Sequence, residues 1–282
     1  MKSCRRLPKL SISVVTYEPD IEILKHSLES LAKSAVYAKS NKIICRLVLI
    51  LIDNGPGRSW KKSLERVLSI FSGQTEFSKV VLLSGHGNIG YGRGHNLGVN
   101  RHIEDFHLVL NPDVIMEKEA LYEGIRFLCR YPQIGMVVPS VFDTAENMQY
   151  LCKRYPTVLD LALRGFCPPR LQNLFYERLS RHEMRDVINN KPVFDVEIAS
   201  GCFMLVRRSS FLKAGGFSDK YFMYFEDFDL SLKFGRLTAI AYLPSMKIVH
   251  MGGGASRKGW MHIRYFAVSA FKFFNQHGWK FF

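Results

Sequence analysis

The sequence predicts an α/β protein in which a mostly parallel central sheet is flanked by helices. Short apolar runs alternate with segments of helical spacing over the first half of the chain. The run over residues 43–52 is rich in Ile, Leu and Val on both faces, as a strand in the middle of a parallel sheet requires. With 282 residues, of which 47% are hydrophobic and 23% charged, the chain can bury one large core. We therefore expect a single domain spanning residues 1–282, with helices on both faces of the sheet.

Each element of the regular half is predicted by its hydrophobic period. Strands are expected at residues 10–15, 43–52, 79–83, 106–110 and 135–138. Helices are expected at residues 21–35, 60–71, about 95–102 and 118–130. The second of these helices is typical, because Trp60, Leu64, Val67 and Phe71 recur on one helical face. Because helices alternate with strands, neighbouring strands should run parallel.

The alternation breaks after about residue 150. Residues 151–192 contain clustered aromatic residues, many arginines and Cys167-Pro168-Pro169, and we interpret them as a helical or irregular insertion beside the site. Regular structure is expected again at residues 193–207, 225–234 and 239–243, with a strand-like run at 246–249. A terminal helix is expected over about 260–276, inside an amphipathic segment at 259–282.

The composition favours a reducing compartment and an anionic partner. No apolar run approaches the ~18–20 residues that span a bilayer, and the N-terminus lacks the pattern of a signal peptide. The six cysteines form no C-x-x-C pair, so we expect free thiols in the cytoplasm and no zinc site. The net charge of +14 fits a nucleotide, an anionic membrane surface or nucleic acid, and it also fits a merely solvated basic surface. The 21 Phe and 12 Tyr favour the membrane, and no recognised motif supports nucleic acid, although a basic nucleic-acid-binding module stays a remote alternative.

Two acidic motifs and one histidine are the strongest candidates for chemistry. Asn111-Pro112-Asp113 follows a predicted strand, where open α/β sheets bind ligands, although it could also be a simple turn. His250 ends another strand-like run, and a carboxylate with an imidazole suits a divalent cation that binds a diphosphate. Glu226-Asp227-Phe228-Asp229 lies within an aromatic run. This position favours a partly desolvated general base over a plain helix cap.

Polar residues and glycines that follow the predicted strands could hold a nucleotide and a sugar. Gly85 to Gly90 spell G-x-G-x-x-G, but the motif follows the third strand, so a dinucleotide site is less favoured than a tight loop against a sugar donor. In that loop Arg93 would face phosphate, while Asn88 and Asn96 would be polar contacts. The other candidates are equally compatible with turns, caps or a bulge: Thr16, Glu18 and Asp53 for base and ribose, Gly201 for close approach of an acceptor, and Arg257 with the glycines after His250 for phosphate.

Taken in order, these motifs resemble the GT-A glycosyltransferases of family 2, and among them the bacterial rhamnosyltransferases of cell-surface polysaccharide synthesis, such as that of O-antigen. The resemblance covers roughly residues 10–258. It rests on Val14-Val15-Thr16-Tyr17, Asp53-Asn54, residues 87–96, Leu110-Asn111-Pro112-Asp113, residues 200–207, 215–219 and 225–230, and the segment that begins at His250.

The resemblance implies a GT-A, Rossmann-like domain with a nucleotide-binding half at 10–115 and an acceptor and catalytic half at 116–258. Thr16, Glu18 and Asp53 would hold the nucleotide, and Gly90 would lie in the donor loop. Asp113, with Asn111 in place of the family's usual first aspartate, would bind Mg²⁺ or Mn²⁺ together with His250. Asp227 would be the catalytic base, flanked by Glu226 and Asp229 near the acceptor. His95 stands where relatives often have Asn.

The activity implied is transfer of a sugar with inversion, most simply rhamnose from dTDP-rhamnose, onto a lipid-linked saccharide. Another nucleotide sugar, such as a UDP-sugar or a galactofuranose donor, is an alternative, as is a nucleotidyltransferase on the same type of sheet. A lipid-linked acceptor would place the enzyme peripherally on the inner face of the cell membrane. The apolar residues of the terminal helix, among them Trp260, Phe266 and Phe271, would either pack on the core or lie in the membrane interface.

Overall fold

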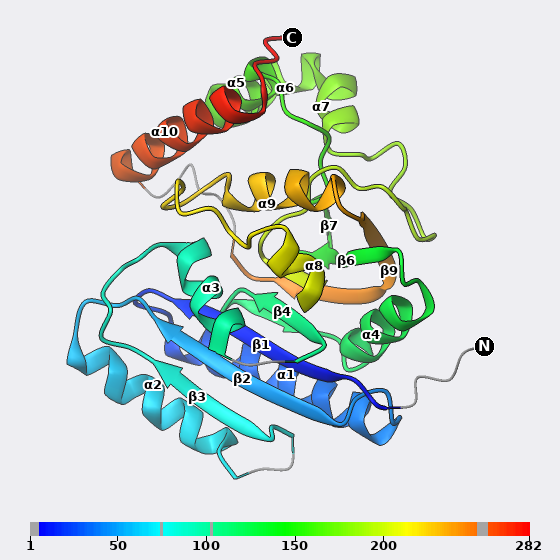
Figure 1. Cartoon of the computed structure of the whole chain (residues 1–282). Helices are drawn as coiled ribbons and strands as arrows, with labels where there is room; N and C mark the ends of the chain where they lie inside the picture. The colour runs from blue at the N-terminus through cyan, green and yellow to red at the C-terminus, as the bar shows by residue number, and fades with distance from the viewer. Residues whose placement is uncertain (1–5, 74–75, 102–103, 253–258) are drawn as a thin grey trace.

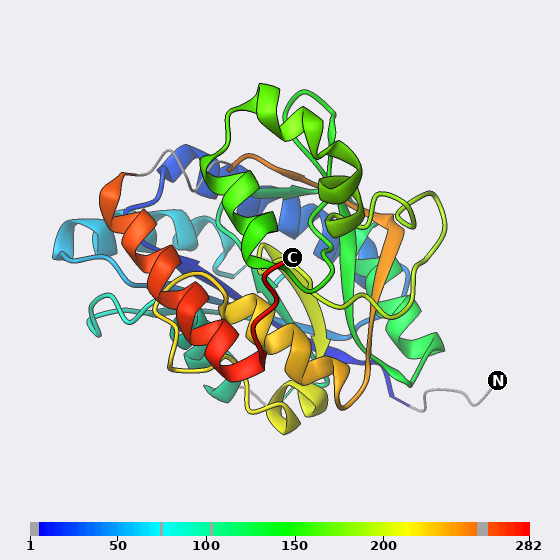
Figure 2. The same cartoon turned by 90° about the horizontal axis from the view of Figure 1, so that it is seen from above.

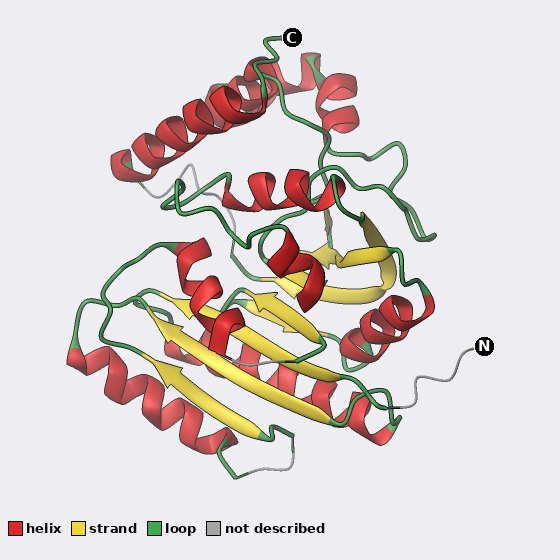
Figure 3. Ribbon diagram, in the orientation of Figure 1, coloured by secondary structure: helices red, strands yellow, loops and turns green. Residues whose placement is uncertain are grey.

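The chain is built around a single nine-stranded sheet with helices on both faces (Figures 1 and 3). The computed structural model describes residues 6–73, 76–101, 104–252 and 259–282. The strands are β1 (Lys9–Thr16), β2 (Arg46–Asp53), β3 (Lys79–Leu83), β4 (Phe106–Leu110), β5 (Val114–Met116), β6 (Ile134–Phe142), β7 (Met148–Gln149), β8 (Phe203–Arg207) and β9 (Ala239–His250). The helices are α1 (Ile21–Ser40), α2 (Arg58–Phe71), α3 (Tyr91–Arg101), α4 (Ala120–Arg130), α5 (Val158–Phe166), α6 (Pro169–Leu174), α7 (Tyr176–His182), α8 (Arg208–Lys213), α9 (Glu226–Gly235) and α10 (Trp260–His277).

The first half of the chain forms the parallel part of the sheet, in the spatial order β3-β2-β1-β4. Each of these strands is linked to the next along the chain by a helix, which is the connection that parallel neighbours need. The carboxyl ends of β1 and β2 are in register, with Thr16 opposite Asp53, and Val14 pairs with Leu110 of β4. The polar residues that follow these strands therefore meet at one edge of the sheet.

The second half is mixed, which corrects the expectation of a mostly parallel sheet. β8 enters antiparallel between β4 and β6, and β5 pairs antiparallel with β9, while β6 and β9 run parallel. Between β7 and β8 the chain passes through the insertion and not through a regular helical crossover. β8 therefore enters the sheet antiparallel to its neighbours β4 and β6. The regular structure expected over 193–207 is limited to β8 and two isolated bridges. The apolar runs at 239–243 and 246–249 are one strand, β9, with an irregularity opposite Pro139 and Ser140.

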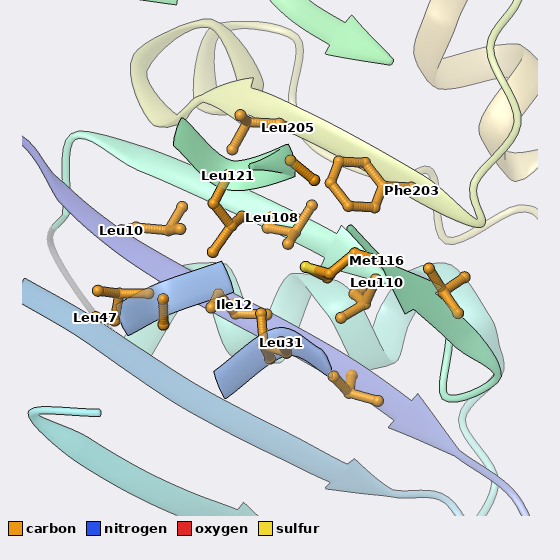
Figure 4. Close-up of a cluster of buried hydrophobic side chains, with 14 of the residues drawn as sticks. Leu10, Ile12, Leu31, Leu47, Leu108, Leu110, Met116, Leu121, Phe203 and Leu205 are labelled. Carbon is orange, nitrogen blue, oxygen red and sulfur yellow. The ribbon is translucent and has the colours of Figure 1, made fainter. Parts of the chain in front are cut away.

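The larger core cluster lies on one face of the sheet, under α1 and α4. Figure 4 shows apolar side chains of four adjacent strands meeting those of α1, α4 and β5. The labelled residues are Leu10, Ile12, Leu47, Leu108, Leu110, Phe203 and Leu205 from the sheet, with Leu31, Met116 and Leu121. On the opposite face, α3, α8 and α9 cover a second cluster. Successive side chains along each strand thus pack alternately into the two cores, as expected for a sheet buried on both sides.

The long helix α1 also orders the segment that follows β4. Asp20 caps its start, since its carboxylate accepts hydrogen bonds from the amides of Glu22 and Ile23. Ser27 donates to the carbonyl of Val114 at 2.8 Å. The hydroxyls of Ser30 and Ser34 accept from the amides of Met116 and Leu121, each at 3.1 Å. These three buried serines satisfy backbone groups that would otherwise be orphaned, and they hold the segment that carries Asp113.

The predicted insertion is helical and lies at the same end of the molecule as α10, where both views of the structure place α5, α6 and α7 (Figures 1 and 2). α5 begins with a capping box, in which Thr157 and Asp160 exchange side-chain and backbone hydrogen bonds. Arg178 of α7 binds the same carboxylate at 2.6 Å. The insertion is therefore tied together by its own polar contacts.

A buried polar chain connects the sheet to α3. Ser11 and Ser13 of β1 are hydrogen-bonded to the two nitrogens of His107 at 2.8 and 2.7 Å, and Ser13 also reaches His95 Nδ1 at 2.6 Å. Both histidines are fully buried. Burial lowers the pKa of His107 to about 3, with a smaller effect from the Arg208 charge. Burial also places the pKa of His95 well below its ordinary value, so both imidazoles are neutral near pH 7.

These histidines should make the protein acid-sensitive. The unfolded chain protonates both imidazoles near pH 6.5, whereas the folded chain does so only at lower pH. The free energy of unfolding should therefore fall as the pH drops below 6.5, by up to roughly 1.4 kcal/mol per pH unit for each histidine, until the folded pKa is reached. Urea denaturation at a series of pH values measures this slope. His107→Asn should flatten it and His26→Gln, at an exposed position, should not; an unchanged slope in His107→Asn would assign the acid sensitivity to other groups.

Candidate functional site

Asp113 and His250 meet at the end of the sheet. Asp113 lies in the turn between β4 and β5, and His250 is the last residue of β9. Because β5 pairs with β9, the two residues are brought together although they are far apart in sequence, and His250 Nε2 lies 3.4 Å from Asp113 Oδ1. The Asn111 side-chain nitrogen lies 3.4 Å from the same imidazole nitrogen. This convergence was expected from the sequence, while the role of the pair as metal ligands stays a prediction.

The backbone after β9 closes over the Asp113 carboxylate. The amide of Met251 donates to the Asp113 carbonyl at 2.9 Å. A Cβ placed on Gly252 would lie 2.0 Å from Asp113 Oδ2 and 3.4 Å from His250 Nε2. Only glycine fits at this position without displacing the carboxylate.

Tyr91, the first residue of α3, links this pair to the acidic motif of α9. Its hydroxyl lies 3.0 Å from Asn111 Oδ1 and 2.6 Å from the carbonyl of Gly201, while the Gly201 amide donates to Asp227 Oδ2 at 2.9 Å. Burial raises the pKa of Tyr91 well above its usual value, assisted by the surrounding acids, so the hydroxyl remains a donor. The residues from His250 through Asn111, Tyr91 and Gly201 to Asp227 therefore form one connected site.

Sequence reasoning assigned no role to Tyr91. It lies within the run of glycines at 87–94, and its spacing in α3 resembles that of an ordinary helix residue packed on the sheet. One feature of the sequence could have indicated a role for this residue. It is a tyrosine between two glycines at a helix start, directly after the predicted donor loop.

The two acids at the start of α9 are removed from solvent to different extents, with Glu226 buried and Asp227 partly buried. Glu226 is buried, and its Oε2 has no hydrogen-bond partner among the described residues. Burial raises the pKa of Glu226, and the adjacent Asp227 charge raises it further. Burial also raises the pKa of Asp227, although the amides of Gly201 and Phe228 favour its charged form. A carboxylate with a raised pKa that is still held by amides is suited to accept a proton.

A strained turn presents these acids. Tyr224 and Phe225 are consecutive left-handed residues, with φ of 69° and 64°. Such a conformation costs about 1–2 kcal/mol for each non-glycine residue, so the surrounding packing must hold it.

α10 supplies that packing through its inner face. Ser269 donates to the Met223 carbonyl at 2.8 Å, and His262 is hydrogen-bonded to the Tyr224 hydroxyl at 2.7 Å. The Phe225 ring contacts those of Phe266 and Phe273, with centroids 5.1 and 5.2 Å apart. Of the two alternatives for the apolar residues of α10, packing on the core holds for this face of the helix.

Asp229 also connects α9 to α10, while its predicted position near the acceptor stays a prediction. Its carboxylate is fully buried. Gln276 and His277 of α10 contact Oδ1 at 2.7 and 2.9 Å, and Lys233 lies 3.0 Å from Oδ2. Through these contacts Asp229 holds α10 against the catalytic turn.

The predicted nucleotide residues gather at the carboxyl ends of β1 and β2. Thr16 and Asp53 end these strands side by side, and both are nearly fully buried. Asp53 Oδ1 accepts from the Gly55 amide at 2.8 Å. Asn54 donates to the carbonyl of Gly90 at 3.0 Å and so joins this edge to the glycine loop. Gly90 has a φ of 90° and lies against the Phe222 carbonyl, so this loop also needs a glycine.

Two donor candidates contact distant parts of the chain. Asn96 uses both ends of its amide on the backbone of Phe217, at 3.0 and 2.8 Å, and therefore anchors that loop. Arg93 engages the side chain and carbonyl of Asp219, and the donor roles of both residues stay predictions. These partners lie more than a hundred residues away in the sequence, so the motif itself could not reveal them.

Three other predicted positions have different outcomes. Asn88 is exposed, and its side chain accepts from the amide of Gly90 at 3.1 Å. Glu18 is exposed in a left-handed turn after β1, with φ of 46°. Arg257 lies outside the described residues.

The site fits a divalent cation whose coordination is completed by a bound diphosphate. No group of three or more His, Cys, Asp or Glu side chains is placed to hold a metal within the part of the chain that the structure describes. Asp113 and His250 offer one oxygen and one nitrogen donor, which suits Mn²⁺ or Mg²⁺ when a diphosphate supplies further oxygens. The protein alone would therefore bind such an ion weakly.

Sequence relatives of the chain are rhamnosyltransferases. No known protein-family model matches the chain. It is 26% identical over 186 residues to N-acetylglucosaminyl-diphospho-decaprenol L-rhamnosyltransferase of Mycobacterium tuberculosis, covering 62% of this chain and 59% of the relative. It is 27% identical over 174 residues to rhamnosyltransferase WbbL of Escherichia coli, covering 58% of this chain and 61% of the relative. The chain thus matches about three fifths of the length of these curated relatives.

Solved structures define the fold class. The chain superposes with a TM-score of 0.60, at 13% identity, on GalNAc-T7 crystallised with UDP, GalNAc and Mn²⁺, covering 87% of this chain and 43% of that one. It superposes with a TM-score of 0.59, at 13% identity, on the mannosyltransferase PcManGT of Pyrobaculum calidifontis in complex with GDP-Man and Mn²⁺, covering 92% of this chain and 61% of that one. The fold is that of the GT-A glycosyltransferases, as predicted. Within that class, the predicted resemblance to bacterial rhamnosyltransferases is also confirmed.

Gly252→Ala tests whether the Asp113 carboxylate binds the metal-diphosphate. The new Cβ would force Oδ2 aside, so affinity for Mn²⁺ with a nucleoside diphosphate should fall by at least about tenfold, a loss of roughly 1.4 kcal/mol. Isothermal titration measures the affinity. Gly165→Ala is the matched control, because nothing lies within 4 Å of its Cβ position. Equal affinity in wild type and Gly252→Ala would argue against the carboxylate as a ligand.

Proposed function

We propose that the protein is an inverting glycosyltransferase that moves rhamnose from dTDP-rhamnose onto a lipid-linked saccharide in cell-surface polysaccharide synthesis. The observation that carries this proposal is the connected path from the Asp113–His250 pair to Asp227. It joins a candidate diphosphate site to a candidate base through direct contacts. The relatives of the chain support the choice of sugar, and the fold supports a nucleotide-sugar donor.

The donor nucleotide would bind at the carboxyl ends of β1 and β2. Thr16 and Asp53 lie there with Asn54 and the Gly90 backbone, which together offer both donors and acceptors to a base and a ribose. The diphosphate would then extend towards Asp113, which follows the neighbouring strand β4. The first half of the chain, at 10–115, would thus bind the nucleotide, and the rest would supply His250 and the base.

Asp227 would be the general base. Its raised pKa brings the carboxylate closer to the operating pH, so it can take the proton of an acceptor hydroxyl as that oxygen attacks the anomeric carbon. The bond from the anomeric carbon to the nucleoside diphosphate breaks on the opposite face, which inverts the configuration. The Gly201 and Phe228 amides would fix the carboxylate during this step.

Asp113 and His250 would hold a divalent cation, with Mn²⁺ and Mg²⁺ as the candidates. When bound, such an ion neutralises charge that develops on the departing diphosphate. The Mn²⁺ in both solved GT-A structures supports this assignment. Neutral Asn111, hydrogen-bonded to Tyr91, would orient the site without adding charge.

The acceptor would be a saccharide attached to a lipid diphosphate, as the name of the mycobacterial relative describes for that protein. Among the described residues, no helix is both long and apolar enough to cross a bilayer. We propose that the protein reaches its acceptor as a peripheral protein on the inner face of the cell membrane.

A donor screen tests the function directly. The purified protein is incubated with dTDP-rhamnose, with UDP-sugars and with a galactofuranose donor, each with a lipid-diphosphate N-acetylglucosamine acceptor and with or without Mn²⁺. Transfer only from dTDP-rhamnose, strengthened by Mn²⁺, is the expected result. Transfer from a UDP-sugar alone would replace the proposed donor, and no transfer from any of them would reject the proposed activity.

Asp227→Asn should separate catalysis from binding. Without a base, kcat should fall by roughly 10²–10⁴-fold, while the Kd for the donor nucleotide changes little because Asp227 does not contact it. The matched control is Asp195→Asn, at an exposed left-handed position that asparagine tolerates. Near-normal turnover in a folded Asp227→Asn protein would remove this residue from the mechanism.

A further inference from the structure

The outer face of α10 is an apolar surface that nothing in the described structure covers. Its exposed large side chains are Trp260, Met261, Val268 and Phe271, which are 76%, 49%, 46% and 58% exposed. Met261, Val268 and Phe271 follow Trp260 by one, eight and eleven residues, so the four side chains lie on one side of the helix, opposite the buried Ser269 and Phe273. One exposed apolar residue is ordinary, but a continuous row of four along one helix marks an interaction surface.

The aromatic surface continues beyond the helix. Trp279 stacks on Phe274 and on Phe281, with ring centroids 5.1 and 5.6 Å apart, and it also meets the edge of Phe271 at 5.8 Å. Trp279 and Phe281 are 42% and 56% exposed. α10 and the segment that follows it lie together at one end of the molecule, beside α5 (Figure 2). The surface is therefore an extended shelf and not an isolated stripe; we call it the α10 shelf, defined by residues 260, 261, 264, 268, 271, 279 and 281.

The charged side chains of α10 and of the segment that follows it are all basic. The chain contains no aspartate or glutamate after Asp229, and residues 230–282 carry eight lysines and arginines. Arg264 is exposed on the shelf itself, between Trp260 and Phe271 in the helix, and Lys272 and Lys280 flank it. A protein partner would usually be met by a polar rim of mixed charge, whereas aromatic and basic side chains without acids suit an anionic lipid surface.

We infer that the α10 shelf is a membrane-binding surface, which lies in the headgroup region of an anionic bilayer. This inference rests on the proposed function, because a lipid-linked acceptor requires the site to work at a bilayer. Trp260 and Phe271 enter the interface, and Arg264 extends its guanidinium to the lipid phosphates.

The shelf is the reverse side of the helix that holds the catalytic turn. The inner face of α10 binds the Met223 carbonyl, the Tyr224 hydroxyl and the Asp229 carboxylate. A bilayer bound to the outer face is therefore separated from the turn that presents Asp227 by the thickness of one helix, about 10 Å. This arrangement keeps the base near the plane in which a lipid-linked acceptor lies.

The test is sedimentation of the full chain with phosphatidylcholine vesicles that contain or lack phosphatidylglycerol. Wild type should bind the anionic vesicles and release at high salt. Trp260→Ser combined with Phe271→Ser should weaken binding at least about tenfold, and Arg264→Gln should weaken it only on anionic vesicles. The matched control is Ile70→Ser with Leu237→Ser, two exposed apolar residues outside the shelf, which should bind like wild type.

Transfer to a short-chain, water-soluble acceptor separates the membrane-binding surface from the proposed glycosyltransferase activity. The shelf double variant should keep this activity, since its side chains are exposed and away from the site, and should lose activity only on vesicle-embedded acceptor. Undiminished vesicle binding in the double variant, or wild type that binds neither vesicle, would overturn the membrane surface while leaving the proposed activity standing. A stable dimer that the double variant abolishes would overturn it in favour of self-association. A wild type that binds anionic vesicles through the shelf but transfers no sugar would reject only the proposed activity.

Discussion

The hydroxyl of Tyr91 is the contact on which the rest of the site depends. It bridges Asn111, at the end of the parallel half of the sheet, and Gly201, which leads into the antiparallel strand β8. The Gly201 amide in turn fixes Asp227. A single, partly buried side chain thus sets the position of the candidate diphosphate site relative to the candidate base. Burial keeps its hydroxyl protonated, so the bridge does not depend on pH in the physiological range.

Two structural supports maintain this arrangement from opposite sides. Beneath the sheet, the serines of α1 bind the backbone on both sides of β5 and so hold the turn of Asp113. Above it, α10 holds the left-handed turn of Tyr224 and Phe225 and the carboxylate of Asp229. The conformational cost of the turn is offset by aromatic packing and by hydrogen bonds that only a docked α10 can provide. The helix that we assign to the membrane is therefore also part of the support of the catalytic residues.

The sequence allowed the regular half of the fold and the main pair of the site to be predicted, for physical reasons. Strands β1 to β4 are continuous apolar runs, and helices between them require parallel pairing. Asp113 and His250 were predicted to lie together, because a carboxylate and an imidazole that each end a strand can bind one cation. The direction of β8 was not predictable, because an apolar run has the same pattern in either direction. The contacts of Asn96, Arg93 and Asp229 were not predictable, because their partners, Phe217, Asp219 and His277, are brought near only by the fold.

The central claim is that the ends of β4 and β9 hold the donor diphosphate through one cation, beside the base on α9. A crystal structure of the protein with dTDP and Mn²⁺ tests it most directly. The account predicts anomalous scattering from one Mn²⁺ bound by Asp113 and His250, at ligand distances of about 2.0–2.3 Å, with the thymidine at the carboxyl ends of β1 and β2. A nucleotide bound with its diphosphate away from Asp113, or an ion bound without His250, would contradict it.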